Sequence, residues 1–104
     1  MINLQLLGFD WDEGNRKKCH KHGLSSKEIE EFFAQDVLVT PDISHSQEEE
    51  RFLAVGRSRK SKTMMVVFTF RESKGKLLIR PISARYMREK ESKRYEQEDS
   101  KIEK

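Results

Sequence analysis

The run MMVVFTF at residues 64–70 is the feature that most constrains the fold of this chain. A nearly continuous apolar run of this length is typical of a central strand with both faces covered. Segments with strand character lie on either side of it, RFLAVGR at 51–57 and KLLIRPIS at 76–83. Because only a basic turn and a hairpin loop at 72–75 separate these segments, we expect them to pair antiparallel.

Two further strands are predicted, at residues 3–9 (NLQLLGF) and 37–41 (VLVTP), and residues 42–49 read as a polar loop. Pro81 lies in the last strand. Since proline donates no ladder hydrogen bond, that strand should be interrupted there or lie at an edge.

Helix signals fall between the first two strands. Asp12 and Glu13 precede a basic run, which favours a helix reaching about His22, and Gly23 suits the position after its end. Ser25 and Glu28 form a capping box that begins a second helix, which should end near residues 35–36.

A third helical pattern covers residues 84–96, with Ser83 as its candidate N-cap, and the polar residues 97–104 should fray. The predicted order is therefore β-α-α-β-β-β-β-α. It defines one α+β domain over residues 1–96, with three helices on an antiparallel sheet of four to five strands. Six aromatic residues are predicted to belong to its core: Phe9, Trp11, Phe32, Phe33, Phe68 and Phe70.

The charge of the chain is unevenly distributed. Residues 57–88 contain ten Lys or Arg and one acid, Glu72, although the formal net charge is only +3. Such a basic half suits nucleic acid or an acidic protein surface as a partner, and equally a solvated basic face. The single cysteine cannot form an intrachain disulfide, and no signal peptide is apparent, so we expect a cytoplasmic protein.

Six segments follow one another along the chain: WDEGN (11–15), KHG (21–23), EERF (49–52), AVGR (54–57), VVFTFRE (66–72) and IRPISARYM (79–87). Together they resemble the BrnT toxin family, whose members have a RelE-like fold. The resemblance implies an endoribonuclease toxin of a type II toxin–antitoxin system, neutralised by a BrnA-type antitoxin that carries a ribbon-helix-helix DNA-binding domain. Contact with DNA would then be indirect, and two toxin copies could be present in the complex.

RNA cleavage without a metal uses the ribose 2′-hydroxyl as nucleophile, and it needs proton-transfer groups and cations around the phosphate. His22 is the first candidate for proton transfer, and Lys21 the second. Cys19, His20 and His22 offer only part of a ligand set, so we predict no metal site and no cofactor.

Arg80 lies on an otherwise apolar strand face and Arg85 in the expected first turn of the last helix, so both join the catalytic candidates. The candidates for binding RNA or its phosphates are Arg57, Ser83, Tyr86, Arg51 and Arg71. Each has a structural alternative: the arginines could pair with glutamates, and Tyr86 could pack on the sheet. A member of the same fold that only binds RNA or an antitoxin is the competing functional hypothesis.

Overall fold

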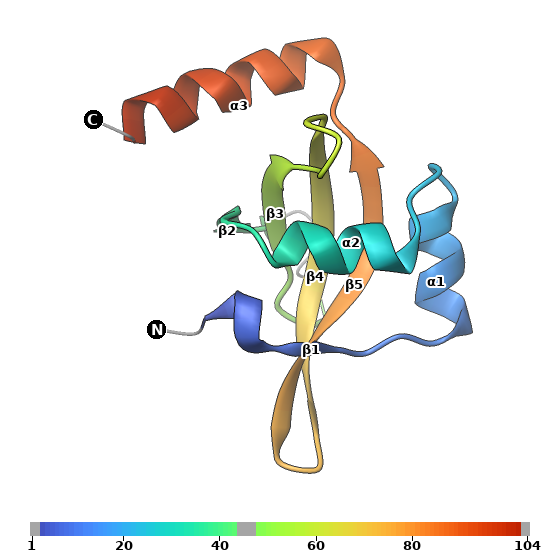
Figure 1. Cartoon of the computed structure of the whole chain (residues 1–104). Helices are drawn as coiled ribbons and strands as arrows, with labels where there is room; N and C mark the ends of the chain where they lie inside the picture. The colour runs from blue at the N-terminus through green and yellow to red at the C-terminus, as the bar shows by residue number, and fades with distance from the viewer. Residues whose placement is uncertain (1–2, 44–47, 103–104) are drawn as a thin grey trace.

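The computed structural model describes residues 3–43 and 48–102, and the elements follow the predicted order (Figure 1). The helices and strands are β1 (Gly8–Phe9), α1 (Glu13–His20), α2 (Ser26–Phe33), β2 (Leu38–Pro41), β3 (Phe52–Arg57), β4 (Thr63–Ser73), β5 (Lys76–Tyr86) and α3 (Glu89–Ile102). The α+β class is confirmed. Part of the predicted loop at 42–49, including His45, lies outside the described residues.

The five strands form one sheet in the order β1-β5-β4-β3-β2. Strands β2 to β5 pair antiparallel, as predicted, whereas β1 pairs parallel with β5 through Gly8 and Leu78. The sheet is therefore mixed. A two-residue loop, Lys74–Gly75, joins β4 to β5 with positive φ at both residues, the conformation that matches the twist of a hairpin.

The first strand is much shorter than predicted. Residues Leu4–Leu6 form a 3₁₀ turn, and the Asn3 side chain accepts a hydrogen bond from the backbone N–H of Gln5. Leu4 and Leu7 pack against the core. Their spacing of three residues fits a turn of 3₁₀ helix and not the alternation of a strand.

Both N-terminal helices begin at capping boxes. Ser25 and Glu28 cap α2 as predicted, and Asp12 with Asn15 caps α1. Helix α1 ends at His20, slightly before the predicted end, and Gly23 follows with φ of +88°. The positive φ explains a glycine there, because side chains with a Cβ rarely adopt this conformation.

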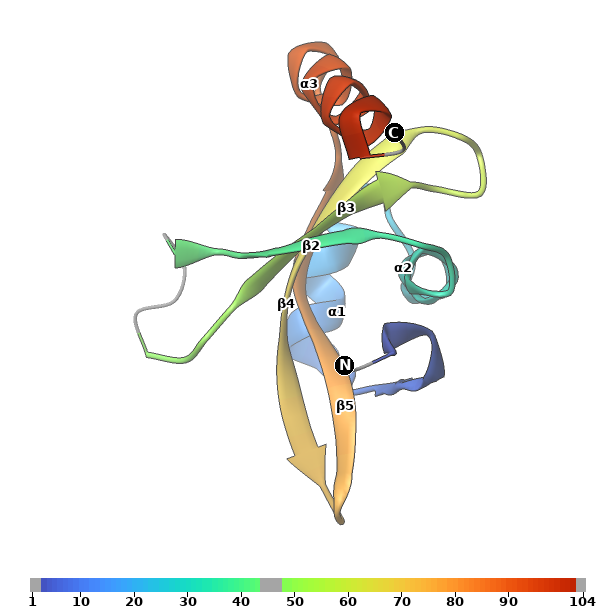
Figure 2. The ribbon, with the colours of Figure 1, turned by 90° about the vertical axis from the view of Figure 1, so that its left-hand side faces the viewer.

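Helix α2 crosses one face of the sheet and α1 lies along β5 (Figure 1, Figure 2). The core lies under α2, where the ring of Phe33 packs against Phe32 and Phe68 with centroids 5.2 Å away in each case. Phe9, Trp11 and Phe70 pack against this core, so the predicted aromatic core is confirmed.

The other face of the sheet is more open. Along β4 the residues Met64, Val66 and Phe68 are fully buried, whereas Met65 and Val67 between them are only half-buried. The prediction that both faces of this strand are covered is therefore wrong. The side of the sheet that carries Met65 and Val67 is called the open face below.

The largest correction concerns the last strand. Residues 83–86 continue β5, because Ser83 pairs with Val67 and Tyr86 with Met64 across the ladder. Ser83 is therefore not a helix cap, and Arg85 is not in a first helical turn. Helix α3 begins at Glu89 and runs to Ile102, beyond the predicted end at 96 and into the segment expected to fray.

Candidate functional site

A hollow on the open face brings together candidates from separate parts of the chain. It has a volume of about 280 Å³, and its polar lining consists of His22, Arg51, Ser83 and Arg85. Met65, Val67 and Ile82 supply apolar lining. We call it the His22 hollow. It combines an imidazole, a hydroxyl and two guanidinium groups over an apolar floor.

Strand register explains why Ser83 and Arg85 share this hollow. They pair with Val67 and Met65, and residues opposite each other in an antiparallel ladder point to the same face. Tyr86, the next residue along β5, points to the other side, where its hydroxyl lies 3.4 Å from a carboxylate oxygen of Glu28. Tyr86 therefore lies on the face away from the hollow.

His22 reaches the hollow from the loop after α1. It is exposed, as is Lys21, which caps the helix and does not line the hollow. His20, named above only as part of an incomplete ligand set, lies 3.4 Å from the Ser26 hydroxyl. Of the two proton-transfer candidates, only His22 is placed beside the arginines.

A second hollow lies next to the first on the open face. It has a volume of about 450 Å³ and is lined by charged residues that include Lys18, Glu49, Arg51, Arg71 and Arg80. We call it the Arg71 hollow. Arg51 and Ile82 line both hollows and so mark the boundary between them.

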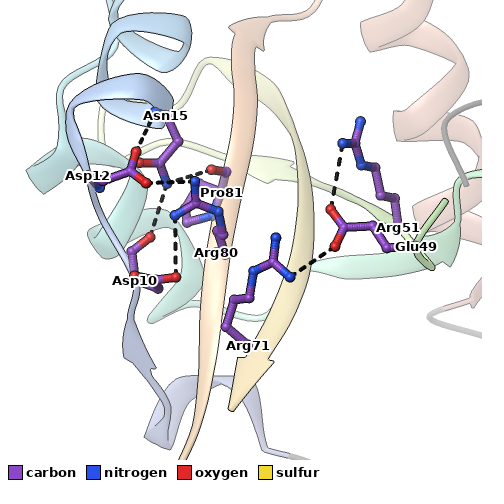
Figure 3. Close-up of polar contacts among 8 residues, drawn as sticks. All are labelled: Asp10, Asp12, Asn15, Glu49, Arg51, Arg71, Arg80 and Pro81. Atoms are coloured by element: carbon purple, nitrogen blue, oxygen red, sulfur yellow. Dashed lines mark hydrogen bonds and ion pairs between the residues drawn. The ribbon is translucent and has the colours of Figure 1, made fainter. Parts of the chain in front are cut away.

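Glu49 bridges two arginines of the Arg71 hollow (Figure 3). Its carboxylate lies 3.1 Å from Arg71 Nη1 and 3.6 Å from Arg51 Nη2. Arg71 lies in β4 and Arg51 directly precedes β3, so the shared acid holds the guanidinium groups of two separate segments close together. The pairs are partly exposed, and such pairs add little to stability.

Arg80 is tied to the segment that leads into α1 (Figure 3). Its guanidinium nitrogens lie 3.3 Å from Asp10 Oδ2 and 2.8 Å from Asp12 Oδ2, and its side chain is 18% exposed. The backbone N–H of Asn15 is the main cause, and Arg80 the next, of a lowered pKa at Asp12. The arrangement fixes α1 against β5.

Asn15 completes this anchor, and sequence analysis did not single it out. Its amide nitrogen donates to the carbonyl oxygens of Asp10 and Pro81, at 3.0 and 2.8 Å, while its side-chain oxygen accepts from the backbone N–H of Asp12 at 2.7 Å (Figure 3). The spacing of Asp12 and Asn15, three residues apart at the start of the helix, is the signal that could have indicated a cap here.

Helix α3 supplies acids to two of the candidate arginines. Both terminal nitrogens of Arg85 donate to Glu91 at 2.8 Å, and Arg57 lies 3.3 Å from Glu96. Arg85, first, and the backbone N–H of Arg88 lower the pKa of Glu91 to about 2. Arg57, like Lys21 and Tyr86, lines neither hollow.

No group of three or more His, Cys, Asp or Glu in residues 3–43 and 48–102 is arranged to hold a metal ion. Over the same part of the chain, no helix is both long and apolar enough to cross a membrane.

A helix-covered sheet with arginines and a histidine around a hollow on its open face suits a protein that binds or cleaves RNA. The family model described as ribonuclease toxin, BrnT, of type II toxin–antitoxin system matches residues 11–91. The chain belongs to this BrnT family, which confirms the resemblance found in its motifs. A comparison with curated protein sequences gives no match.

Proposed function

We propose that this chain is a metal-independent endoribonuclease that cleaves RNA by attack of a ribose 2′-hydroxyl. The observation that carries the proposal is the His22 hollow, where His22, Ser83, Arg51 and Arg85 face one space. These are the groups that the reaction needs: one to move a proton, and cations to stabilise the charge that develops on phosphorus.

In the proposed reaction, the 2′-oxygen bonds to phosphorus and the bond from phosphorus to the 5′-oxygen breaks. The 2′-hydroxyl loses a proton and the leaving 5′-oxygen gains one, so the products are a 2′,3′-cyclic phosphate and a free 5′-hydroxyl. His22 takes part in proton transfer, and Arg51 and Arg85 bind the non-bridging oxygens. Ser83 donates a hydrogen bond to the same phosphate.

The other candidates receive different roles. Arg71 contacts RNA from the neighbouring hollow. Arg80 is a positioning residue, since its two aspartate partners hold α1 and thereby the loop that carries His22. Lys21 and Arg57 offer exposed charge for phosphates away from the His22 hollow, and Tyr86, on the other face, is left out of the RNA contacts.

One observation favours the competing function, a member that binds RNA or an antitoxin without cleaving. Five candidate arginines pair with carboxylates: Arg51, Arg57, Arg71, Arg80 and Arg85. An RNA phosphate would have to replace some of these acids. Cleavage assays must therefore decide between the two functions.

The test is cleavage of a long single-stranded RNA by the antitoxin-free protein in EDTA. We expect 2′,3′-cyclic phosphate ends, and strong loss of cleavage in His22→Ala and Arg85→Ala. His20→Ala and Arg59→Ala are matched controls outside the hollow, and both should cleave like wild type. If the folded wild-type protein leaves RNA intact, the ribonuclease proposal is wrong and the binding function takes its place.

We also propose a BrnA-type antitoxin as protein partner and the cytoplasm as location. Membership in a type II toxin family supports a protein antitoxin. Co-expression with the product of the adjacent gene should give a complex that purifies together, and light scattering would show whether it contains two toxin copies. An adjacent product that leaves RNA cleavage unchanged would contradict the partner assignment.

A further inference from the structure

A bulge in β5 places one apolar side chain between the two hollows. Val67 pairs with Ser83 and the next residue, Phe68, pairs with Pro81, so Ile82 is an extra residue without a partner on β4. Bulges of this kind redirect a side chain and often lie beside functional sites. Ile82 is half-buried and lines both the His22 hollow and the Arg71 hollow.

The two hollows suit two adjoining parts of one ligand. The first has Met65 and Val67 among its lining, so a flat, weakly polar group can lie in it. The second is lined by Arg71 and Lys18 together with acids that can accept hydrogen bonds. Arg51, the other shared residue, contributes positive charge where the two spaces meet.

Cleavage through the 2′-hydroxyl places a geometric demand on RNA. The attacking 2′-oxygen must lie opposite the leaving 5′-oxygen across the phosphorus, and the regular stacked backbone does not hold these atoms in line. The nucleosides on either side of the phosphate must therefore rotate apart. Apolar side chains such as isoleucine can enter between bases and unstack them, and RNA recognition commonly uses unstacked, splayed bases.

We propose that Ile82 is a wedge that separates the two nucleotides flanking the scissile phosphate. One base lies over the apolar lining of the His22 hollow and the other in the Arg71 hollow, while the phosphate contacts Arg51, Arg85 and Ser83 at the polar side of the His22 hollow. The substrate class is then single-stranded RNA, because a duplex would have to be opened first. This inference rests on the proposed ribonuclease function. Ile82 acts here as a positioning residue, since it brings the reacting atoms into line without exchanging a proton.

The test uses base stacking as a readout that does not depend on cleavage. The probe is a single-stranded oligoadenylate with 2′-fluoro sugars, which lacks the nucleophile, and with one internal 2-aminopurine, which fluoresces more when it is unstacked. Saturating wild-type protein should raise the fluorescence. Ile82→Ala should bind with affinity within about threefold of wild type yet lose most of the rise.

Two further variants separate a wedge from general damage to the sheet. Leu53→Ala removes as many carbon atoms from the same face, and Leu53 lines neither hollow, so this variant should retain the fluorescence rise. Ile82→Leu keeps an apolar side chain of equal size and should restore it. On cleavable RNA, Ile82→Ala should lower kcat by roughly tenfold or more with little change in KM.

The outcomes distinguish the wedge from the ribonuclease proposal. A fluorescence rise that depends on Ile82, in a protein that cleaves no RNA, would keep the wedge and reject the ribonuclease function. Cleavage with no fluorescence rise, or Ile82→Ala that cleaves with wild-type kcat, would overturn the wedge while leaving the ribonuclease function in place.

Discussion

Arg85 and Glu91 form a two-pronged ion pair across the junction between β5 and α3, with both contacts at 2.8 Å. Glu91 also accepts a hydrogen bond from the backbone N–H of Arg88 at the start of the helix. The Glu91 carboxylate therefore caps the start of α3 and also pairs with the guanidinium of Arg85, which lines the His22 hollow. A bound RNA phosphate and Glu91 would compete for the same donors.

Removing the charge of Glu91 should strengthen RNA binding. Glu91→Gln keeps an oxygen that can accept from Arg88, while it removes a negative charge beside the hollow. We expect uncleavable single-stranded RNA to bind a few-fold more tightly in low salt, with the difference reduced in high salt. Fluorescence anisotropy measures this affinity.

Glu89→Gln is the matched control for that change. Glu89 lies on the same helix, pairs with Lys93 and lines neither hollow, and its side chain is 84% exposed. Both variants alter the net charge equally. If they change RNA affinity to the same extent, the competition between Glu91 and phosphate does not exist.

Because of this ion pair, Glu91 should titrate at an unusually low pH. The pKa of Glu91 is lowered to about 2, whereas glutamate in an unfolded chain titrates at about 4.3. The contribution of this pair to folding is therefore fully present above the unfolded pKa and is lost as pH falls through about 2. In Arg85→Gln, the Glu91 pKa should rise towards its ordinary range.

Carbon-13 NMR of the glutamate carboxyl groups would follow this titration. Arg57→Gln is the control, because Arg57 pairs with Glu96 and not with Glu91. A Glu91 midpoint that is identical in wild type and in Arg85→Gln would show that the pair does not form in solution.

Asn15 should contribute substantially to the free energy of unfolding, although its side chain is polar. Asn15→Ala leaves the Pro81 carbonyl and the Asp12 N–H without their present partner, in a side-chain position that is 4% exposed. We expect the free energy of unfolding to fall by about 2–3 kcal/mol. Urea denaturation measures it, and Asn3→Ala, at an exposed cap, should cost less than about 1 kcal/mol. Equal losses in the two variants would argue against the anchoring role of Asn15.

Cys19 should be chemically inert in the folded protein. It is fully buried, and burial raises the pKa of its thiol to about 11. Because the thiolate is the reactive form, a thiol reagent such as DTNB should react only as fast as the region around α1 opens. Rapid, complete reaction under native conditions would contradict this packing, and the same protein in denaturant gives the reference rate.

Local signals in the sequence were sufficient for much of the fold. Ser25 and Glu28 predicted the start of α2 because a capping box is complete within four residues. The last strand was different, since ARYM also fits a helix and the outcome depends on distant partners. Met64 pairs with Tyr86 and Thr63 accepts a hydrogen bond from the backbone N–H of Met87, so the ladder extends β5 past the predicted end.

For the candidate site, too, local signals in the sequence were sufficient for some features, whereas others depend on distant parts of the chain. His22 and Arg85 could be selected from residue chemistry and family resemblance, but their placement around one hollow depends on register and on the loop after α1. The open character of the face beside Met65 and Val67 could not be predicted, since an apolar run gives no indication of which side a helix covers. Asn15 was missed because its essential partner, Pro81, lies in the last strand.

The parallel pairing of β1 with β5 affects when the chain can fold during its synthesis on the ribosome. Gly8 and Phe9 pair with Leu78 and Ile79, residues that are made much later. Contacts between distant segments form only after both segments have emerged from the ribosome. Helix α1 also packs against β5, which is made late. We therefore expect a nascent chain to stay harmless until β5 has left the exit tunnel, which leaves the antitoxin time to meet each new copy as it becomes active.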